Sequence, residues 1–102
     1  MAKSRLELHE ILCNILGSRN VYFQPPSTVK MKYDAIVYSL NDNDVKYADD
    51  MKYIGMKRYN VIAVCRNPDS DLYERILELP YSELDRVYPS DNLNHWSITL
   101  YF

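Results

Sequence analysis

Two stretches of this 102-residue chain carry apolar residues at helical spacing, and neither can cover its own apolar stripe. Side chains three and four positions apart lie on one face of a helix, so both stretches are expected to form amphipathic helices. They span about residues 5–16 and 67–79, with stripes formed by Leu8, Ile11, Leu12, Ile15 and Leu16 and by Leu72, Ile76, Leu77 and Leu79. Two such helices need a shared apolar surface, which a β-sheet can provide.

The ends of both predicted helices carry residues that are typical of helix boundaries. Ser4 and Glu7 form a capping box, and Gly17 stands where a left-handed residue ends a helix. Residues 67–71 contain a proline and carboxylates that suit a helix start, and Pro80 ends the second helix. The first helix is therefore predicted to start near residue 5 and the second to end near residue 79.

Four stretches show the β-rich composition or the alternating pattern of strands. They are Met31–Leu40, Met56–Arg66, Tyr81–Tyr88 and His95–Phe102, and the last two are separated by the turn-forming residues 89–92. Alternate residues of a strand share one face of the sheet, so one face of the last strand should point toward the helices. The residues predicted for that face are Trp96, Ile98, Leu100 and Phe102.

These elements predict an α+β fold in which residues 1–102 form a single domain. The order α-β-β-α-β-β predicts a four-stranded, mostly antiparallel sheet with both helices on one face. Residues 20–28 are expected to form a short extended piece and a stiff connector, because two prolines cannot donate ladder hydrogen bonds. Residues 41–55 are predicted to form a long, β-hairpin-like excursion between the first two strands of the sheet.

Composition excludes several classes of protein. Hydrophobic residues make up 47% and charged residues 25% of the chain, which is typical of a folded domain and not of a disordered tail. No apolar run reaches the roughly 18 residues of a membrane span, and no signal peptide is recognisable, so a cytoplasmic location is expected. The formal net charge of −2 gives no global attraction to nucleic acid or anionic lipid.

The residues that could perform chemistry are few and scattered. Cys13 and Cys65 are expected to be buried thiols, and with His9 and His95 they match no zinc spacing. The Asn-Asp-Asn-Asp stretch at residues 41–44 lacks the glycine and terminal glutamate of a calcium loop. A hydrolytic site needs a nucleophile, a base and an orienting group, and Cys65 with His95 is the best of the few candidates for the first two roles. We therefore predict no enzymatic activity, no metal and no cofactor.

Ten tyrosines against two glycines favour a protein that works through an interface. The predicted interface is the sheet face away from the helices, with Tyr33, Tyr59 and Tyr101. An alternative is a surface that stacks bases of RNA or single-stranded DNA, because basic residues alternate with aromatic ones. That surface would consist of Lys30, Lys32, Lys52, Lys57 and Arg58 with Tyr33, Tyr53 and Tyr59.

Almost the whole chain resembles the tail terminator and head-tail joining (tail completion) proteins of long-tailed bacteriophages. The resemblance depends on the order and spacing of several short motifs, none of which is catalytic. Besides the capped first helix, they are Val21-Tyr22-Phe23-Gln24-Pro25-Pro26, Ala35-Ile36-Val37-Tyr38, Tyr47-Ala48-Asp49, Lys57-Arg58-Tyr59-Asn60-Val61, Asn67-Pro68-Asp69-Ser70 and Asp91-Asn92-Leu93-Asn94-His95.

The resemblance implies a virion protein that is assembled in the cytoplasm of a bacterial host. Such a protein forms a ring, usually a hexamer, that docks on the tail tube, stops its growth and joins a head-completion or neck protein. DNA would pass through the ring without sequence-specific binding. A neck or head-closure role in the same class of virus is an alternative. The tube or a neighbouring subunit is expected to contact the excursion, through Asp42, Asp44, Tyr47, Asp49, Asp50, Lys52 and Tyr53.

Overall fold

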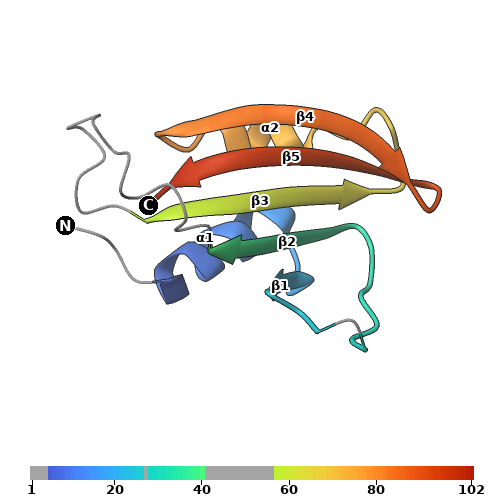
Figure 1. The fold of residues 1–102 in the computed structure, drawn as a ribbon, viewed down its shortest axis with the longest axis horizontal. Helices are drawn as coiled ribbons and strands as arrows, with labels where there is room; N and C mark the ends of the chain where they lie inside the picture. The colour runs from blue at the N-terminus through green and yellow to red at the C-terminus, as the bar shows by residue number, and fades with distance from the viewer. Residues whose placement is uncertain (1–4, 27, 41–56) are drawn as a thin grey trace.

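The computed structural model describes residues 5–26, 28–40 and 57–102, which form two helices and a five-stranded sheet (Figure 1). The described elements are α1 (Arg5–Leu16), β1 (Val21–Phe23), β2 (Ala35–Leu40), β3 (Arg58–Cys65), α2 (Leu72–Leu77), β4 (Ser82–Ser90) and β5 (Leu93–Tyr101). None of the helices in these ranges is long and apolar enough to cross a membrane. The predicted α+β class is confirmed.

The sheet has the strand order β1-β2-β3-β5-β4 and is mixed, not purely antiparallel. β1 pairs parallel with β2, and the three other pairs of neighbouring strands are antiparallel. The expectation of four strands was therefore wrong. The short extended piece near residue 20 is a fifth strand, and only three residues of it pair, which is too few to show a period of two.

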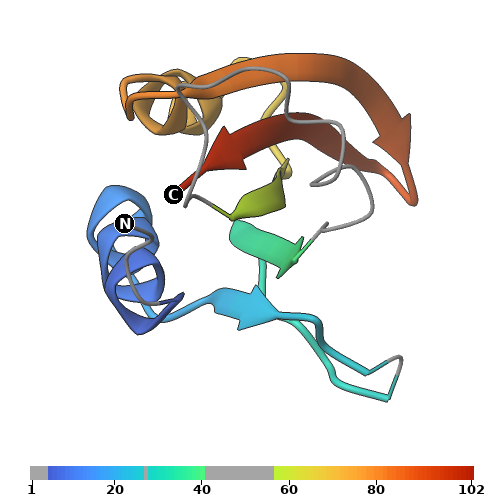
Figure 2. The same ribbon diagram turned by 60° about the vertical axis from the view of Figure 1, so that its left-hand side comes forward.

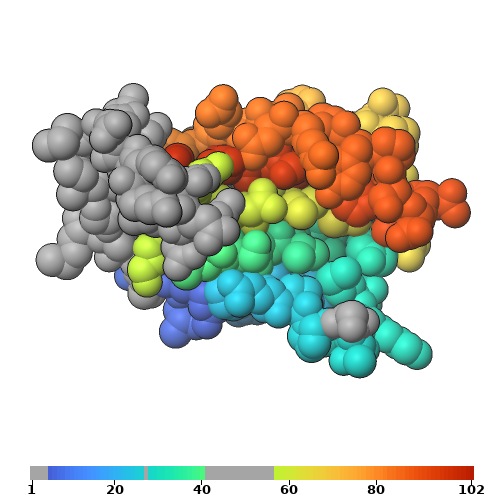
Figure 3. Space-filling model, in the orientation of Figure 1, coloured from blue at the N-terminus to red at the C-terminus, as the bar shows by residue number. Residues whose placement is uncertain are grey.

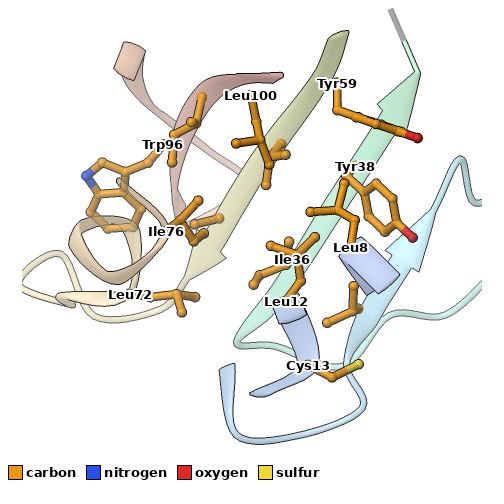
Figure 4. Packing of buried hydrophobic residues seen from close by; sticks show 14 of the residues in the cluster. Leu8, Leu12, Cys13, Ile36, Tyr38, Tyr59, Leu72, Ile76, Trp96 and Leu100 are labelled. Atoms are coloured by element: carbon orange, nitrogen blue, oxygen red, sulfur yellow. The ribbon is translucent and has the colours of Figure 1, made fainter. Parts of the chain in front are cut away.

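Both helices lie on the same face of the sheet, as Figure 2 shows. We call the sheet face that the helices cover the inner face and the opposite face the outer face. The core lies between the helices and the inner face, and most of its large side chains appear in Figure 4. Its members include Leu8 and Leu12 of α1, Ile36 and Tyr38 of β2, Tyr59 and Val61 of β3, Leu72 and Ile76 of α2, and Trp96, Ile98 and Leu100 of β5.

The helix ends agree only partly with the sequence expectations. α1 has the predicted bounds, and Gly17 follows it with a φ of +83° and an N–H that donates to the carbonyl of Cys13 at 2.8 Å. Ser4 of the predicted capping box lies outside the described residues. α2 is shorter than predicted, since it begins at Leu72 and ends at Leu77, and the residues up to Pro80 form turns.

All four predicted strands differ in their bounds from the expectation, and β5 runs from Leu93 to Tyr101 instead of from His95 to Phe102. β2 begins at Ala35, although the pattern predicted a strand from Met31, and β3 occupies most of the predicted Met56–Arg66. β4 continues through Pro89, where the strand was expected to end. Proline is tolerated there because β4 lies at the edge of the sheet. Asp91 and Asn92 make the hairpin turn to β5 with φ angles of +54° and +64°.

Candidate functional site

The outer face of the sheet is the surface that the helices leave for other contacts. Inner-face residues such as Val61 and Ile98 are fully buried, so their neighbours along each strand point to the outer face. A row crosses the middle of this face through the paired residues Val37, Ile62 and Ser97. Val37 and Ile62 are half-buried. This part of the outer face is therefore apolar at its centre.

A β-bulge in β4 decides which side chains join this face. Between Leu84 and Arg86 the pairing with β5 slips by one residue, so Asp85 is the extra residue of the bulged strand. Leu84 pairs with Ile98 and so lies on the inner face. Strict alternation along β4 would therefore direct Arg86 and Tyr88 to the inner face as well. The bulge directs them to the outer face instead, opposite Ser97 and His95.

Arg86, Tyr88 and His95 stack on one another, and we call them the outer-face cluster. The rings of Tyr88 and His95 lie nearly parallel, with centroids 4.9 Å apart, and the guanidinium carbon of Arg86 lies 4.7 Å from the centroid of Tyr88. Figure 3 shows the face on which β4 and β5, in orange and red, carry this cluster. Arginine and tyrosine are enriched at the centres of protein interfaces. The cluster therefore has the chemistry of a binding surface.

Polar groups beside the cluster are largely satisfied within the protein. The hydroxyl of Thr99 donates to the carboxylate of Asp85, and the hydroxyl of Ser97 donates to the side-chain oxygen of Asn60 at 3.2 Å. Nδ1 of His95 is buried and has no hydrogen-bond partner in the described part of the chain.

A second polar group connects α1 to the sheet beneath it. Nδ1 of His9 lies 2.7 Å from the hydroxyl of Tyr38, and the guanidinium of Arg5 donates to the same hydroxyl oxygen at 3.3 Å. Since arginine can only donate, the Tyr38 hydroxyl proton is free to donate to a neutral His9. Burial, and then the charge of Arg5, lower the pKa of His9, and burial raises the pKa of Tyr38.

This arrangement predicts that acid weakens the fold through His9. The folded pKa of His9 lies below its unfolded value of 6.5, so below that pH the unfolded chain binds protons more readily than the folded chain. The stabilising contribution is present above pH 6.5 and is lost as the pH falls toward the folded pKa. We expect a His9→Gln variant, whose amide oxygen can still accept from Tyr38, to lose less stability between pH 7.5 and 5.5, as measured by urea unfolding. Identical losses in both proteins would contradict the assignment.

The structure places the predicted interface tyrosines in three different settings. Tyr101 alternates with buried Leu100 and so lies on the outer face, half-buried, while Tyr33 is half-buried in the connection before β2. Tyr59 is only 2% exposed and belongs to the core on the inner face, so its predicted place on the interface was wrong. Its position two residues from Val61 fixes that side. The predicted contacts of the excursion, Asp42, Asp44, Tyr47, Asp49, Asp50, Lys52 and Tyr53, lie outside the described residues.

The structure separates the residues of the alternative sites. Lys30 and Lys32 are exposed in the connection before β2, whereas Lys57 precedes β3 at the opposite end of the sheet (Figure 1). The described members of the predicted base-stacking surface therefore do not form one patch. Cys65 faces the core, and His95, on the neighbouring strand, faces the outer side, so this pair cannot act together. In residues 5–26, 28–40 and 57–102, no group of three or more metal-ligating side chains is found.

Sequence reasoning missed the outer-face cluster. The alternation of residues 95–102 does place His95 on the face away from the helices, and that signal could have been used. Arg86 and Tyr88 are different, because the bulge that turns them outward follows from the pairing of β4 with β5 and has no signature in the sequence.

No protein-family model matches this chain, and no curated protein or solved structure is significantly similar to it.

Proposed function

We propose that this chain is a structural assembly protein of a long-tailed bacteriophage. In this proposal it forms a ring at the head-proximal end of the tail tube, stops polymerisation of the tube and offers the surface that joins the head. The partners are further copies of the chain, the tail tube protein and a head-completion or neck protein. The proposal starts from the motifs in the sequence that resemble tail terminator and head-tail joining proteins.

One structural observation supports an assembly role more than any other. Both helices cover the inner face of the sheet, whereas the outer face carries an apolar centre and the stacked Arg86, Tyr88 and His95. Aromatic and arginine side chains around apolar area are typical of surfaces that bind another protein. A ring subunit needs such a surface because each copy must contact its neighbours.

Electron microscopy of particles that lack this protein tests the proposal. We expect disruption of the gene in its phage to give tubes of variable, excessive length together with full heads that are not attached to tails. A matched strain with Lys30→Glu, an exposed change in the connection before β2, should give normal virions. Tails of normal length without heads would instead indicate a neck or head-closure role. Normal virions after disruption of the gene would rule out virion assembly.

A further inference from the structure

The guanidinium of Arg86 stacks on Tyr88 and forms no ion pair with a carboxylate in the described part of the chain. Its stacking on Tyr88 restricts the side chain, which is exposed to solvent. The ion pairs found between described residues join Arg19 to Glu10 and Arg75 to Asp71, and neither uses Arg86. Asp85, the preceding residue of β4, accepts a hydrogen bond from Thr99. A guanidinium that is already oriented loses less entropy on binding a carboxylate than a free one.

The same chain carries a surplus of carboxylates around α2. Asp69, Asp71, Glu74 and Glu78 are all exposed, and among the described residues only Asp71 of these four forms an ion pair, with Arg75. Glu74 accepts a hydrogen bond from the hydroxyl of Tyr73, which leaves its second oxygen available. We call Glu74 and Glu78, which lie four residues apart, the α2 acidic pair. Its charge is complementary to that of the outer-face cluster.

The α2 acidic pair and the outer-face cluster lie on opposite sides of the sheet. Tyr73 of α2 stacks on Trp96 at the inner face of β5, with ring centroids 5.3 Å apart, while the outer-face cluster lies on the outer face of β4 and β5. Within one copy the two surfaces therefore cannot meet. The two surfaces would meet if a second copy lay behind the first, with its outer-face cluster against the α2 acidic pair of its neighbour.

We propose that copies of this chain associate front to back, with the α2 acidic pair of one copy bound to the Arg86–Tyr88–His95 cluster of the next. This proposal rests on the proposed function, since it names the surface through which the ring would form. A front-to-back contact is heterologous, so it repeats from copy to copy until it closes or continues as a filament. Pairing through the edge of β4 is less suitable, because Pro89 and the bulge at Asp85 interrupt that edge.

Charge reversal on each surface tests the contact by sedimentation equilibrium. We expect the wild-type chain to self-associate, and Arg86→Glu and the double variant Glu74→Lys/Glu78→Lys each to weaken association by at least about tenfold, because each places like charges together. A mixture of the two variants should associate again. In the mixture, the reversed cluster of the Arg86→Glu variant can bind the reversed pair of the double variant. The unchanged cluster of the double variant can bind the unchanged α2 acidic pair of the Arg86→Glu variant. Recovery on mixing also excludes misfolding as the cause of the loss.

Lys30→Glu is the matched control, since it reverses one exposed charge outside both surfaces and should leave association unchanged. Three results would overturn the proposal: a wild-type chain that stays monomeric up to about 1 mM, reversals without effect, or a mixture that does not recover. If the wild type binds a labelled single-stranded oligonucleotide and Arg86→Glu abolishes only that binding, the occupant is a nucleic acid and the proposal is wrong.

The two proposals can fail separately. Gene disruption measures tail length and does not depend on which surfaces copies of the chain use. Charge reversal measures self-association of the purified chain and does not depend on a tail. Overlong tails together with charge reversals that have no effect would support the proposed function and reject this interface. Normal virions together with recovery on mixing would support the interface and reject the proposed function.

Discussion

Replacement of Trp96 by alanine should lower the free energy of unfolding by about 3–5 kcal/mol, the range for large aromatic side chains in a core. Trp96 is 5% exposed and lies between β5 and α2, where its ring stacks on that of Tyr73 with an interplanar angle of 3°. Figure 4 shows Trp96 beside Ile76 of α2. Its removal would therefore take away much of the contact that holds α2 on the sheet.

Urea unfolding followed by circular dichroism would measure this loss, and a double-mutant cycle with Tyr73→Ala would isolate the stacking. We expect a coupling energy of about 0.5–1.5 kcal/mol for the ring pair. The substitution Tyr73→Ala alone should lower the free energy of unfolding by less than Trp96→Ala does, because Tyr73 is only partly buried. A loss below about 1 kcal/mol for Trp96→Ala would mean that α2 does not pack there in solution.

The substitution Ile98→Ala should destabilise the protein by about 2–5 kcal/mol, as for other large aliphatic residues in a core. Ile98 is fully buried on the inner face and pairs with Val61 of β3. Ile62 follows Val61 and points to the outer face, where it is half-buried. The same substitution at Ile62 is therefore a matched control, and it should cost clearly less because it leaves no closed cavity.

Equal losses at Ile98 and Ile62, measured by urea unfolding of both variants, would contradict the assignment of faces. Alternation along a strand has a period of two, so an error of one residue in register would exchange the two faces completely. The comparison therefore tests the inner and outer faces as a whole and not only one side chain. It also tests the surface on which the outer-face cluster lies.

Local patterns in the sequence predicted the parts of the fold that depend on neighbouring residues. The bounds of α1 follow from its apolar stripe and from Gly17, and the structure has the same bounds. The inward direction of Trp96, Ile98 and Leu100 follows from strict alternation and is also confirmed. In both cases the deciding interactions join residues that are close in sequence, so a single pattern is enough to identify the element.

The features that were missed depend on partners that are distant in sequence. β1 has only three paired residues, and its parallel pairing with β2 depends on where the chain returns to the sheet. The bulge at Asp85 depends on the register between β4 and β5. The core position of Tyr59 was misjudged because a tyrosine suits an interface as well as a core, and composition does not distinguish the two.

The position of β5 between β3 and β4 links the cooperativity of the fold to the outer-face cluster. β4 has nine residues and no sheet partner other than β5 in the described chain, so the two strands form a hairpin that joins the rest of the sheet through one seam with β3. Opening of that seam would release both strands as one unit. Arg86, Tyr88 and His95 would leave the sheet together. A molecule that binds only these three side chains therefore moves with the hairpin and leaves the opening unchanged, whereas one that also contacts Ile62 of β3 opposes it and slows hydrogen exchange of the hairpin amides as far as Tyr101.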